Sequence, residues 1–374
     1  MDMRQLELKS LKRAYKQAKR RFVTAWKSLA LVMLALALIF TPLTLAAQVF
    51  DNTIAAYLGG DLWKIEGKDL SQVRFEPDFD TREQLKTAAQ ALMAQAALEG
   101  TVLLKNEGVL PLEKGADVCW FYTVEHPEIT ENAGFDNVVS TEGTGTFHAD
   151  VGVVVLTGRE NEQAVLTDAL QQKAAGGVDK LVALLGGVEI PDLTGIDGVI
   201  WQGALDYEAA GKVLSGEVSP SGRLPFTYSK TEAPQNGGIY ADYKYFETRY
   251  EDAVIGTGNA GPFRYEDAVV YPFGYGLTYT AFQYENFAVA HNPQSNTYEV
   301  TLAVTNSGEL AGREVVQVYA QAPYTDYDRE TSVEKAAVNL VGFAKTELLQ
   351  PGQSQSVAIT VRGQDLASFA AGAY

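Results

Sequence analysis

The sequence predicts an α/β domain with a mostly parallel sheet and helices on both faces, followed by an all-β sandwich. Between residues 101 and 236, short apolar runs alternate with helical stretches that end at glycines. From residue 282 onward, apolar and polar residues alternate, and turn signals such as Asn306-Ser307-Gly308 separate the runs. A long apolar segment near the N-terminus predicts an additional transmembrane helix.

The N-terminal segment has the pattern of a membrane anchor. Residues 29–47 (LALVMLALALIFTPLTLAA) carry no charge, which predicts a membrane-spanning helix at 29–48. Residues 1–28 hold nine Lys and Arg against two acidic residues, so the positive-inside rule places this basic segment in the cytoplasm and the folded domains outside it. Its helical spacing also suits a helix on anionic membrane lipid. A cleaved signal peptide is the alternative, because Thr44-Leu45-Ala46 resembles a small-x-small cleavage site.

Composition limits the possible partners and cofactors. The net charge is −17, and the chain after the basic segment is more acidic still, which argues against nucleic acid as a partner. The single cysteine, Cys119, lies in an apolar run and is expected to be a buried, inert thiol. His126, His148 and His291 are too far apart for a His-x-x-x-His pair, so we expect no metal site and no cofactor. The composition leaves the oligomeric state open.

The remaining chain divides by pattern into a connector, two domains and a segment between them. Residues 49–80 form a polar connector, and the α/β domain is expected at 81–236, beginning with a helix that ends at Gly100. Residues 237–280 are rich in aromatic residues and glycine and show no clear period, so they are assigned to a linking segment before a sandwich at 281–374. Within the α/β domain, strands are expected at 116–122, 151–157, 179–185 and 197–202, and helices at 162–175 and 206–214.

Five segments in this order resemble motifs of glycoside hydrolase family 3. They are 96–112 (AALEGTVLLKNEGVLPL), 220–225 (PSGRLP), 239–250 (IYADYKYFETRY), 271–279 (YPFGYGLTY) and 311–319 (AGREVVQVY). The resemblance implies the family's α/β sandwich domain followed by a fibronectin type III-like domain, which is expected to be incomplete at its end. It also implies a β-glucosidase-like activity on glycosides or oligosaccharides.

The resemblance does not extend to the family's catalytic barrel. That (β/α)₈ barrel carries an aspartate nucleophile in a Ser-Asp-Trp-like motif, and neither this tripeptide nor an eightfold strand–helix series occurs in the sequence. Some members of the family resemble a permuted order in which the barrel follows the fibronectin-like domain. We therefore expect a barrel beyond residue 374 and no glycosidase activity from these residues alone.

The second catalytic group is expected in the loop 157–163 (TGRENEQ). Retaining glycosidases use two carboxyl groups about 5–5.5 Å apart, and the resemblance implies that this loop carries the acid/base. The family pattern is similar to R-x-G-E-G-x-D. Arg159 and Glu160 match its arginine and glutamate, whereas its glycines and its aspartate are missing. Glu160 is the candidate acid/base, Glu162 the alternate, and Arg159 a candidate substrate-binding residue. Either glutamate could instead only stabilise the N-terminus of the next helix.

Two further side-chain types have expected roles. Tyr243 and Tyr245 are candidates for stacking on sugar rings, with packing of the linking segment as the alternative. Arg223, in the PSGRLP turn, is expected to bridge carbonyls or a carboxylate at the domain edge. Two functions stay open: a membrane-anchored glycosidase acting on β-glucosides or related oligosaccharides, and a non-catalytic carbohydrate-binding or scaffold ectodomain derived from one.

Overall fold

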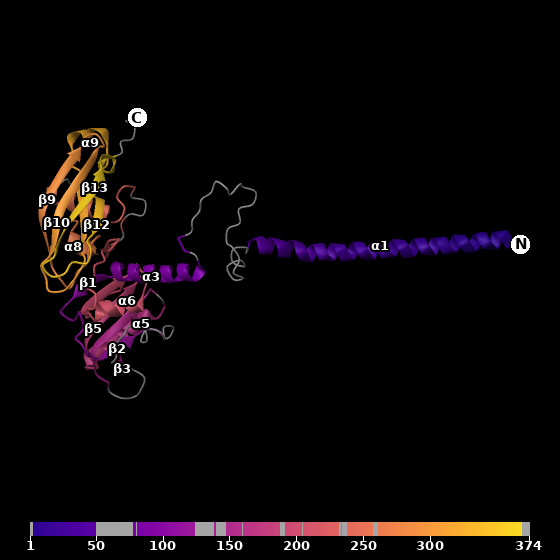
Figure 1. Cartoon of the computed structure of the whole chain (residues 1–374), viewed down its shortest axis with the longest axis horizontal. Helices are drawn as coiled ribbons and strands as arrows, with labels where there is room; N and C mark the ends of the chain where they lie inside the picture. Colours follow the sequence, from indigo (N-terminus) through magenta and orange to yellow (C-terminus); the bar gives the residue numbers. More distant parts are fainter. Residues whose placement is uncertain are drawn as a thin grey trace. The chain divides into compact units, whose positions relative to one another are not determined.

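A computed structural model describes most of the chain, in two compact units (Figure 1). The units are Met1–Asp80 and Thr81–Tyr374. The described residues are 3–49, 78–79, 81–123, 138–139, 147–158, 160–187, 191–203, 205–231, 233, 238–256 and 261–368. Most of the predicted connector at 49–80 and the predicted substrate-binding Arg159 therefore lie outside the described residues.

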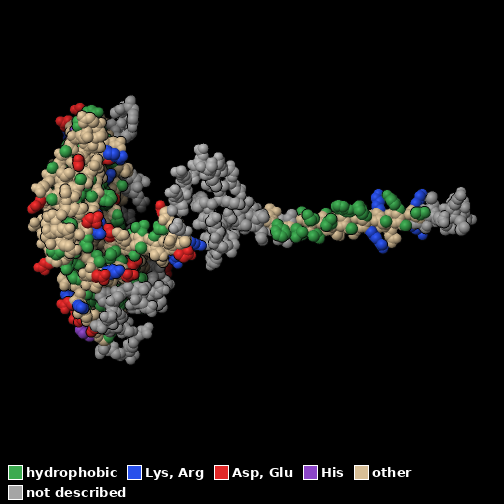
Figure 2. Space-filling view, in the orientation of Figure 1, with side chains coloured by type: hydrophobic (Ala, Val, Ile, Leu, Met, Phe, Trp, Pro, Cys, Tyr) green, Lys and Arg blue, Asp and Glu red, His purple; other side chains and the backbone are tan. Residues whose placement is uncertain are grey.

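The first unit contains one long helix, α1 (Met3–Val49). It includes both the basic segment and the apolar segment of the sequence, without a break between them. Figure 2 shows Lys and Arg side chains on the half of α1 toward the N-terminus and hydrophobic side chains on the other half. Among the residues that the structure describes, no helix meets both the length and the apolarity required to cross a membrane.

The second unit begins with a six-stranded sheet flanked by helices. The strand order is β1-β6-β5-β4-β2-β3, with β1 antiparallel to β6 and the other neighbours parallel. Its elements are α3 (Arg82–Gly100), β1 (Val102–Asn106), β2 (Val118–Phe121), β3 (Val138–Val139), β4 (Ala149–Leu156), α5 (Glu162–Ala175), β5 (Val178–Gly186), β6 (Gly198–Gln202) and α6 (Tyr207–Leu214). The predicted α/β fold with a mostly parallel sheet is confirmed.

The sheet is buried on both faces because β4 and β5 are nearly continuous apolar runs. Alternate side chains of β4 enter two separate cores. Val154 packs in the core that contains Leu166 of α5, whereas Val153 packs in the core that contains Val213 of α6. Helices of opposite faces therefore complete the two cores, which confirms the predicted helices on both faces of the sheet.

The predicted helix ends are confirmed by local geometry. Gly176 ends α5 with φ of 79°, a left-handed conformation that glycine adopts without a Cβ clash. Asp206 caps α6, because its side chain accepts a hydrogen bond from the Ala209 N–H at 2.9 Å. Both boundaries lie within one or two residues of the positions that the sequence indicates.

The linking segment contains a helix that the sequence pattern does not reveal. Helix α7 (Tyr243–Ile255) has 13 residues, of which only Phe246 is buried. A single buried position gives no apolar stripe, so the helical period is absent from the sequence. The other elements of this segment are α8 (Tyr265–Ala268) and β8 (Val269–Tyr271). Strand β8 pairs antiparallel with the short strand β7 (Tyr228–Ser229), which lies near the end of the predicted α/β domain.

The last part of the unit is a β-sandwich. A three-stranded sheet of order β13-β10-β9 shares a core with the two-stranded sheet β11–β12. Along β10, buried Val300, Leu302 and Val304 alternate with less buried residues, which confirms the predicted period of two. The elements are β9 (Phe282–Asn292), β10 (Thr297–Asn306), β11 (Val315–Gln321), α9 (Asp326–Thr331), β12 (Val338–Lys345), β13 (Ser354–Arg362) and the 3₁₀ helix η2 (Gly363–Leu366).

Candidate active site

The strand order creates a point where the chain connections diverge. From β2, the chain continues to β3 on one side, and the next strand, β4, pairs with the other side of β2. Ligands of open α/β sheets bind outside the carboxyl ends of strands at such a point. Here these ends are Phe121 of β2 and Leu156 of β4, and Phe121 lies opposite Val154 in the parallel pair. The loop after β4, which contains Glu160, therefore lies at the position where this architecture binds ligands.

The β4–α5 loop is short and has two left-handed residues. Gly158 has φ of +82° and Asn161 has φ of 71°. Asparagine is one of the few residues other than glycine that visits this region routinely. Between these two turns lies Glu160, whose side chain is exposed. The local backbone thus leaves the Glu160 carboxyl group accessible at the carboxyl edge of the sheet.

Glu162 has a different environment from Glu160. It is buried at 7% relative exposure, and its carboxylate accepts hydrogen bonds from the Thr157 N–H at 2.6 Å, the Gly158 N–H at 2.8 Å and the Thr157 hydroxyl at 2.5 Å. These contacts fasten the first turn of α5 to the end of β4. The Asn161 side chain makes no capping bond, and the Glu162 carboxylate bonds to Thr157 and Gly158, which precede the helix, rather than to N–H groups of its first turn.

The two candidate sugar-stacking tyrosines contact other parts of the protein. Tyr243 stacks on Phe273 with ring centroids 4.4 Å apart, and its hydroxyl oxygen accepts a hydrogen bond from the Leu340 N–H at 3.0 Å. Tyr245 packs edge-on against Phe246 at 5.2 Å. These contacts join α7 to its own segment and to the sandwich, which favours the packing role over the sugar-binding role.

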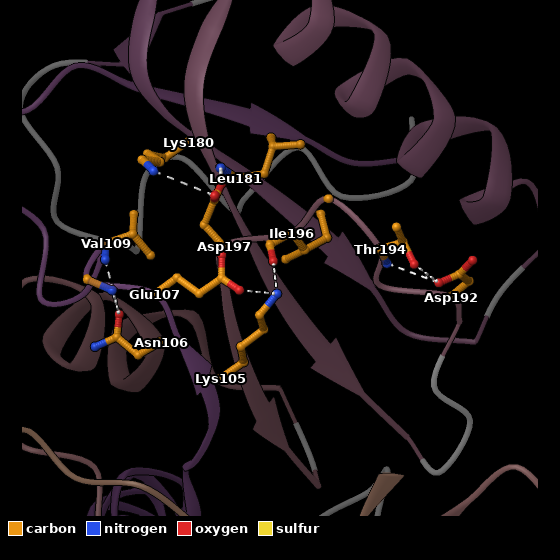
Figure 3. Close-up of polar contacts among 12 residues, drawn as sticks. Lys105, Asn106, Glu107, Val109, Lys180, Leu181, Asp192, Thr194, Ile196 and Asp197 are labelled. Carbon is orange, nitrogen blue, oxygen red and sulfur yellow. Dashed lines mark hydrogen bonds and ion pairs between the residues drawn. The ribbon is translucent and has the colours of Figure 1, made fainter. Parts of the chain in front are cut away.

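A buried polar cluster of the α/β domain lies at the opposite end of the parallel strands (Figure 3). Asp197, just before β6, is buried and accepts hydrogen bonds from the Leu181 N–H at 2.7 Å and from Lys173 Nζ at 2.6 Å. Burial opposes ionisation of this carboxyl, but the hydrogen bond from Lys173 and that from the Leu181 N–H hold its pKa below the usual value. Nearby, Lys105 Nζ donates to the Ile196 carbonyl at 2.6 Å. All these groups are satisfied by protein partners, as structural clusters are.

The fold defines a class of protein: an α/β domain with a mostly parallel sheet followed by a β-sandwich, with the exposed side chain of Glu160 in the loop after β4. Residues 128–279 match the glycosyl hydrolase family 3 C-terminal domain, and residues 314–373 match the fibronectin type III-like domain. The chain thus carries the C-terminal domain of glycosyl hydrolase family 3 followed by a fibronectin type III-like domain, as its motifs indicate.

Individual relatives agree with this assignment. The chain is 34% identical to a beta-glucosidase of Ruminococcus albus, across 78% of this chain and 37% of that protein. It is 36% identical to beta-glucosidase A of Butyrivibrio fibrisolvens, across 45% of this chain and 22% of that protein. It is also 28% identical to an exo-1,4-beta-xylosidase of Emericella nidulans, across 79% of this chain and 45% of that protein. The chain therefore spans less than half the length of these curated relatives.

Solved structures share the fold. A Bifidobacterium adolescentis family 3 beta-glucosidase has a TM-score of 0.59 at 22% identity, covering 81% of this chain and 50% of that one. Beta-glucosidase 3B of Thermotoga neapolitana in complex with glucose has a TM-score of 0.58 at 24% identity, covering 79% of this chain and 50% of that one. At these identities the likeness establishes the fold and not the chemistry of a site.

Proposed function

We propose that the chain is the non-barrel portion of a retaining glycoside hydrolase that cleaves O-glycosidic bonds of β-glucosides or similar oligosaccharides. In this proposal Glu160 is the acid/base, and the nucleophile belongs to a barrel outside these 374 residues. The observation that carries it is the position of Glu160, exposed at the carboxyl end of β4 beside the point where the chain connections diverge. The names of the relatives, beta-glucosidases and a beta-xylosidase, support the substrate class.

The chemistry needs one carboxyl group to protonate the leaving oxygen and then to activate water. An exposed carboxyl on a short, bent loop can face a second domain that brings the sugar and the nucleophile. Glu162 is less suited to this step because its carboxylate is already engaged with Thr157 and Gly158. The two glutamates therefore divide the tasks that the sequence leaves open: Glu160 for chemistry and Glu162 for holding the loop.

The test uses the complete protein and an aryl β-glucoside with an activated leaving group. Glu160→Gln should lower kcat by about 10²–10⁴-fold, the range typical of a general acid/base. Because such a leaving group departs without an acid, the slow step becomes attack of water on the glycosyl-enzyme, and azide should restore turnover as the glycosyl azide. The matched control is Glu208→Gln, which replaces an exposed carboxylate on α6 and should leave kcat unchanged. Full activity of Glu160→Gln would remove Glu160 from the mechanism.

We also propose that residues 29–48 anchor the protein in the membrane with residues 1–28 in the cytoplasm. The support is the sequence itself: an uncharged apolar stretch that follows a strongly basic segment. Cys119 is buried, so engineered cysteines can be labelled over a low background. In intact cells, Asp78→Cys should react with a membrane-impermeant thiol reagent and Lys16→Cys should not. Mass measurement of the mature protein distinguishes an anchor from a cleaved signal peptide, because cleavage after Ala46 would remove the whole basic segment.

A non-catalytic ectodomain remains the second candidate. The observation in its favour is the brevity of the β4–α5 loop, which has five residues, 157–161, between the strand and the helix. Such an ectodomain would bind oligosaccharides without turnover. Two results together would support this function over the first. The complete protein would bind a cello-oligosaccharide saturably, and it would show no hydrolysis that depends on Glu160, as judged with Glu160→Gln.

A further inference from the structure

Three side chains with metal-binding atoms converge at the amino-terminal edge of the sheet, away from the β4–α5 loop. His148 immediately precedes β4, Asp150 is its second residue, and Asp179 is the second residue of β5. One ligand atom from each residue lies within 4.8 Å of the other two. The Nε2 atom of His148 is 3.8 Å from Oδ2 of Asp179. All three side chains are exposed, so an ion can reach them from solvent.

The strand register explains why residues distant in sequence meet here. Ala149 pairs with Val178 and Val151 pairs with Lys180 in the parallel β4–β5 ladder, so Asp150 and Asp179 lie side by side. The flanking Ala149 and Val178 are buried, which turns the two aspartates outward. The spacing of histidines in the sequence could not reveal this cluster. It contains a single histidine, His148, and one of its two aspartates, Asp179, lies on the next strand, β5.

The surroundings orient the possible ligands. The Nδ1 atom of His148 lies 3.3 Å from the Gly176 carbonyl oxygen. The tautomer that donates Nδ1–H to this carbonyl leaves the Nε2 lone pair free, on the side of Asp179. Metal-binding histidines usually donate their other ring N–H to a carbonyl or carboxylate in this way. Asp150 is held as well, because its Oδ2 accepts a hydrogen bond from the Asp117 N–H at 2.8 Å.

The local charge also favours a cation. Two carboxylates lie together, and within the described residues no Lys or Arg forms an ion pair with Asp150 or Asp179. The neighbouring Lys180 extends instead to Asp197, 3.7 Å away. A divalent ion between the carboxylates would remove their mutual repulsion. An imidazole nitrogen with two carboxylate oxygens suits Zn²⁺ and similar transition metals, whereas Ca²⁺ and Mg²⁺ prefer oxygen ligands alone.

We propose that His148, Asp150 and Asp179 form a binding site for a divalent transition-metal ion of the Zn²⁺ type. The ion cross-links the beginnings of β4 and β5, and water completes its coordination. Thr157 lies seven positions after Asp150 in the sequence, about 23 Å along an extended strand. The site is therefore remote from Glu160, and its role is to stabilise the sheet rather than to take part in glycoside cleavage. It does not depend on the proposed function.

The test is Zn²⁺ binding by the full chain, expressed without a histidine tag and freed of metal with a chelator. Isothermal titration calorimetry should show one Zn²⁺ per chain, and Zn²⁺ in excess of Kd should raise Tm because only the folded state has the assembled site. His148→Ala and Asp179→Asn should each weaken Zn²⁺ binding by about tenfold or more. Co²⁺ bound to the wild-type chain should give a visible spectrum that both variants lose.

Matched controls are His291→Ala and Asp192→Asn, which remove a histidine and an exposed aspartate elsewhere and should bind Zn²⁺ as the wild type does. Equal Zn²⁺ affinity of wild type and His148→Ala would overturn the proposal, as would absence of binding to the wild type at millimolar Zn²⁺. Binding of Mg²⁺ as tight as that of Zn²⁺ would contradict the assigned class of ion. Since none of these readouts involves sugar hydrolysis, failure of the proposed function leaves the result unaffected.

Discussion

The Nη2 atom of Arg223 lies 2.7 and 2.8 Å from the two carboxylate oxygens of Glu314, across the junction between the α/β domain and the sandwich. Arg223 also donates through Nη1 to the Gly276 carbonyl, and Tyr284 donates its hydroxyl hydrogen to Glu314 at 2.7 Å. Glu314 is 7% exposed. The expectation that Arg223 bridges a carbonyl and a carboxylate at the domain edge is confirmed.

Loss of this buried carboxylate should be costly. Glu314→Ala leaves the Arg223 guanidinium largely buried without its counter-charge, so we expect the free energy of unfolding to fall by about 3 kcal/mol or more. Urea denaturation of the full chain measures it. The control is Glu347→Ala, which removes a carboxylate that is 84% exposed and 3.4 Å from Arg313. Exposed pairs contribute little, so this variant should change stability by less than about 1 kcal/mol. Equal effects of the two variants would contradict the assigned role of Glu314.

Substitutions at Glu162 should separate its packing role from that of Glu160. Glu162→Ala removes the acceptor of the Thr157 and Gly158 N–H groups and should cost about 1–3 kcal/mol of stability. Glu162→Gln should cost less than about 1 kcal/mol, because its amide oxygen can accept both N–H bonds while its NH₂ donates to the Thr157 hydroxyl.

Glu160→Ala is the matched control for these two variants, because it removes an exposed carboxyl from the same loop. Its stability should stay within about 0.5 kcal/mol of the wild type. Thermal and urea unfolding of the three variants supply the comparison. A Glu160→Ala chain as unstable as Glu162→Ala would show that the loop depends on both carboxylates, contrary to the division of tasks drawn from their contacts.

The difference between these glutamates shows what the sequence can and cannot predict. The runs that form β4 and β5 are apolar enough to predict buried strands, and the loop position follows from them. Which of the two acids points outward depends on the left-handed turns at Gly158 and Asn161, and no periodicity encodes these. Side-chain partners from another strand, such as Asp179 for His148, depend on strand register, which a single sequence leaves undetermined.

Gly222, in the PSGRLP turn, should not tolerate a side chain. Its N–H donates to the Thr101 carbonyl at 2.9 Å, and a Cβ would lie 2.6 Å from the carbonyl oxygens of both Gly100 and Thr101. These are backbone atoms that cannot rotate aside, so Gly222→Ala should cost about 1–3 kcal/mol. Gly100→Ala is the control, since its Cβ would meet nothing within 4 Å at the end of α3 and alanine favours the helix. Equal stability of the two variants would show that the turn can move away from α3.

Asp328 should make the stability of the sandwich depend on acid pH. Its carboxylate lies 2.7 Å from Lys335 Nζ and accepts hydrogen bonds from the Thr325 N–H and hydroxyl, both at 2.7 Å. The hydrogen bond from Lys335, followed by those from Thr325, lowers the pKa of Asp328 from its ordinary 3.8 to about 2. Because the folded pKa lies below the unfolded one, the stabilisation is complete above about pH 4 and is lost as the pH falls toward about 2.

Asp328→Asn should therefore be less stable than the wild type near neutral pH, and the difference in Tm should shrink as the pH is lowered through this window. Protonation of the wild-type carboxyl removes the charge that the variant already lacks, which is why the two curves should converge. The control is Asp326→Asn, which changes a side chain that is 86% exposed on the same short helix. This variant should differ little from the wild type at any pH. A gap between wild type and Asp328→Asn that stays constant down to about pH 2 would show that the Lys335 contact does not depend on the charge of Asp328.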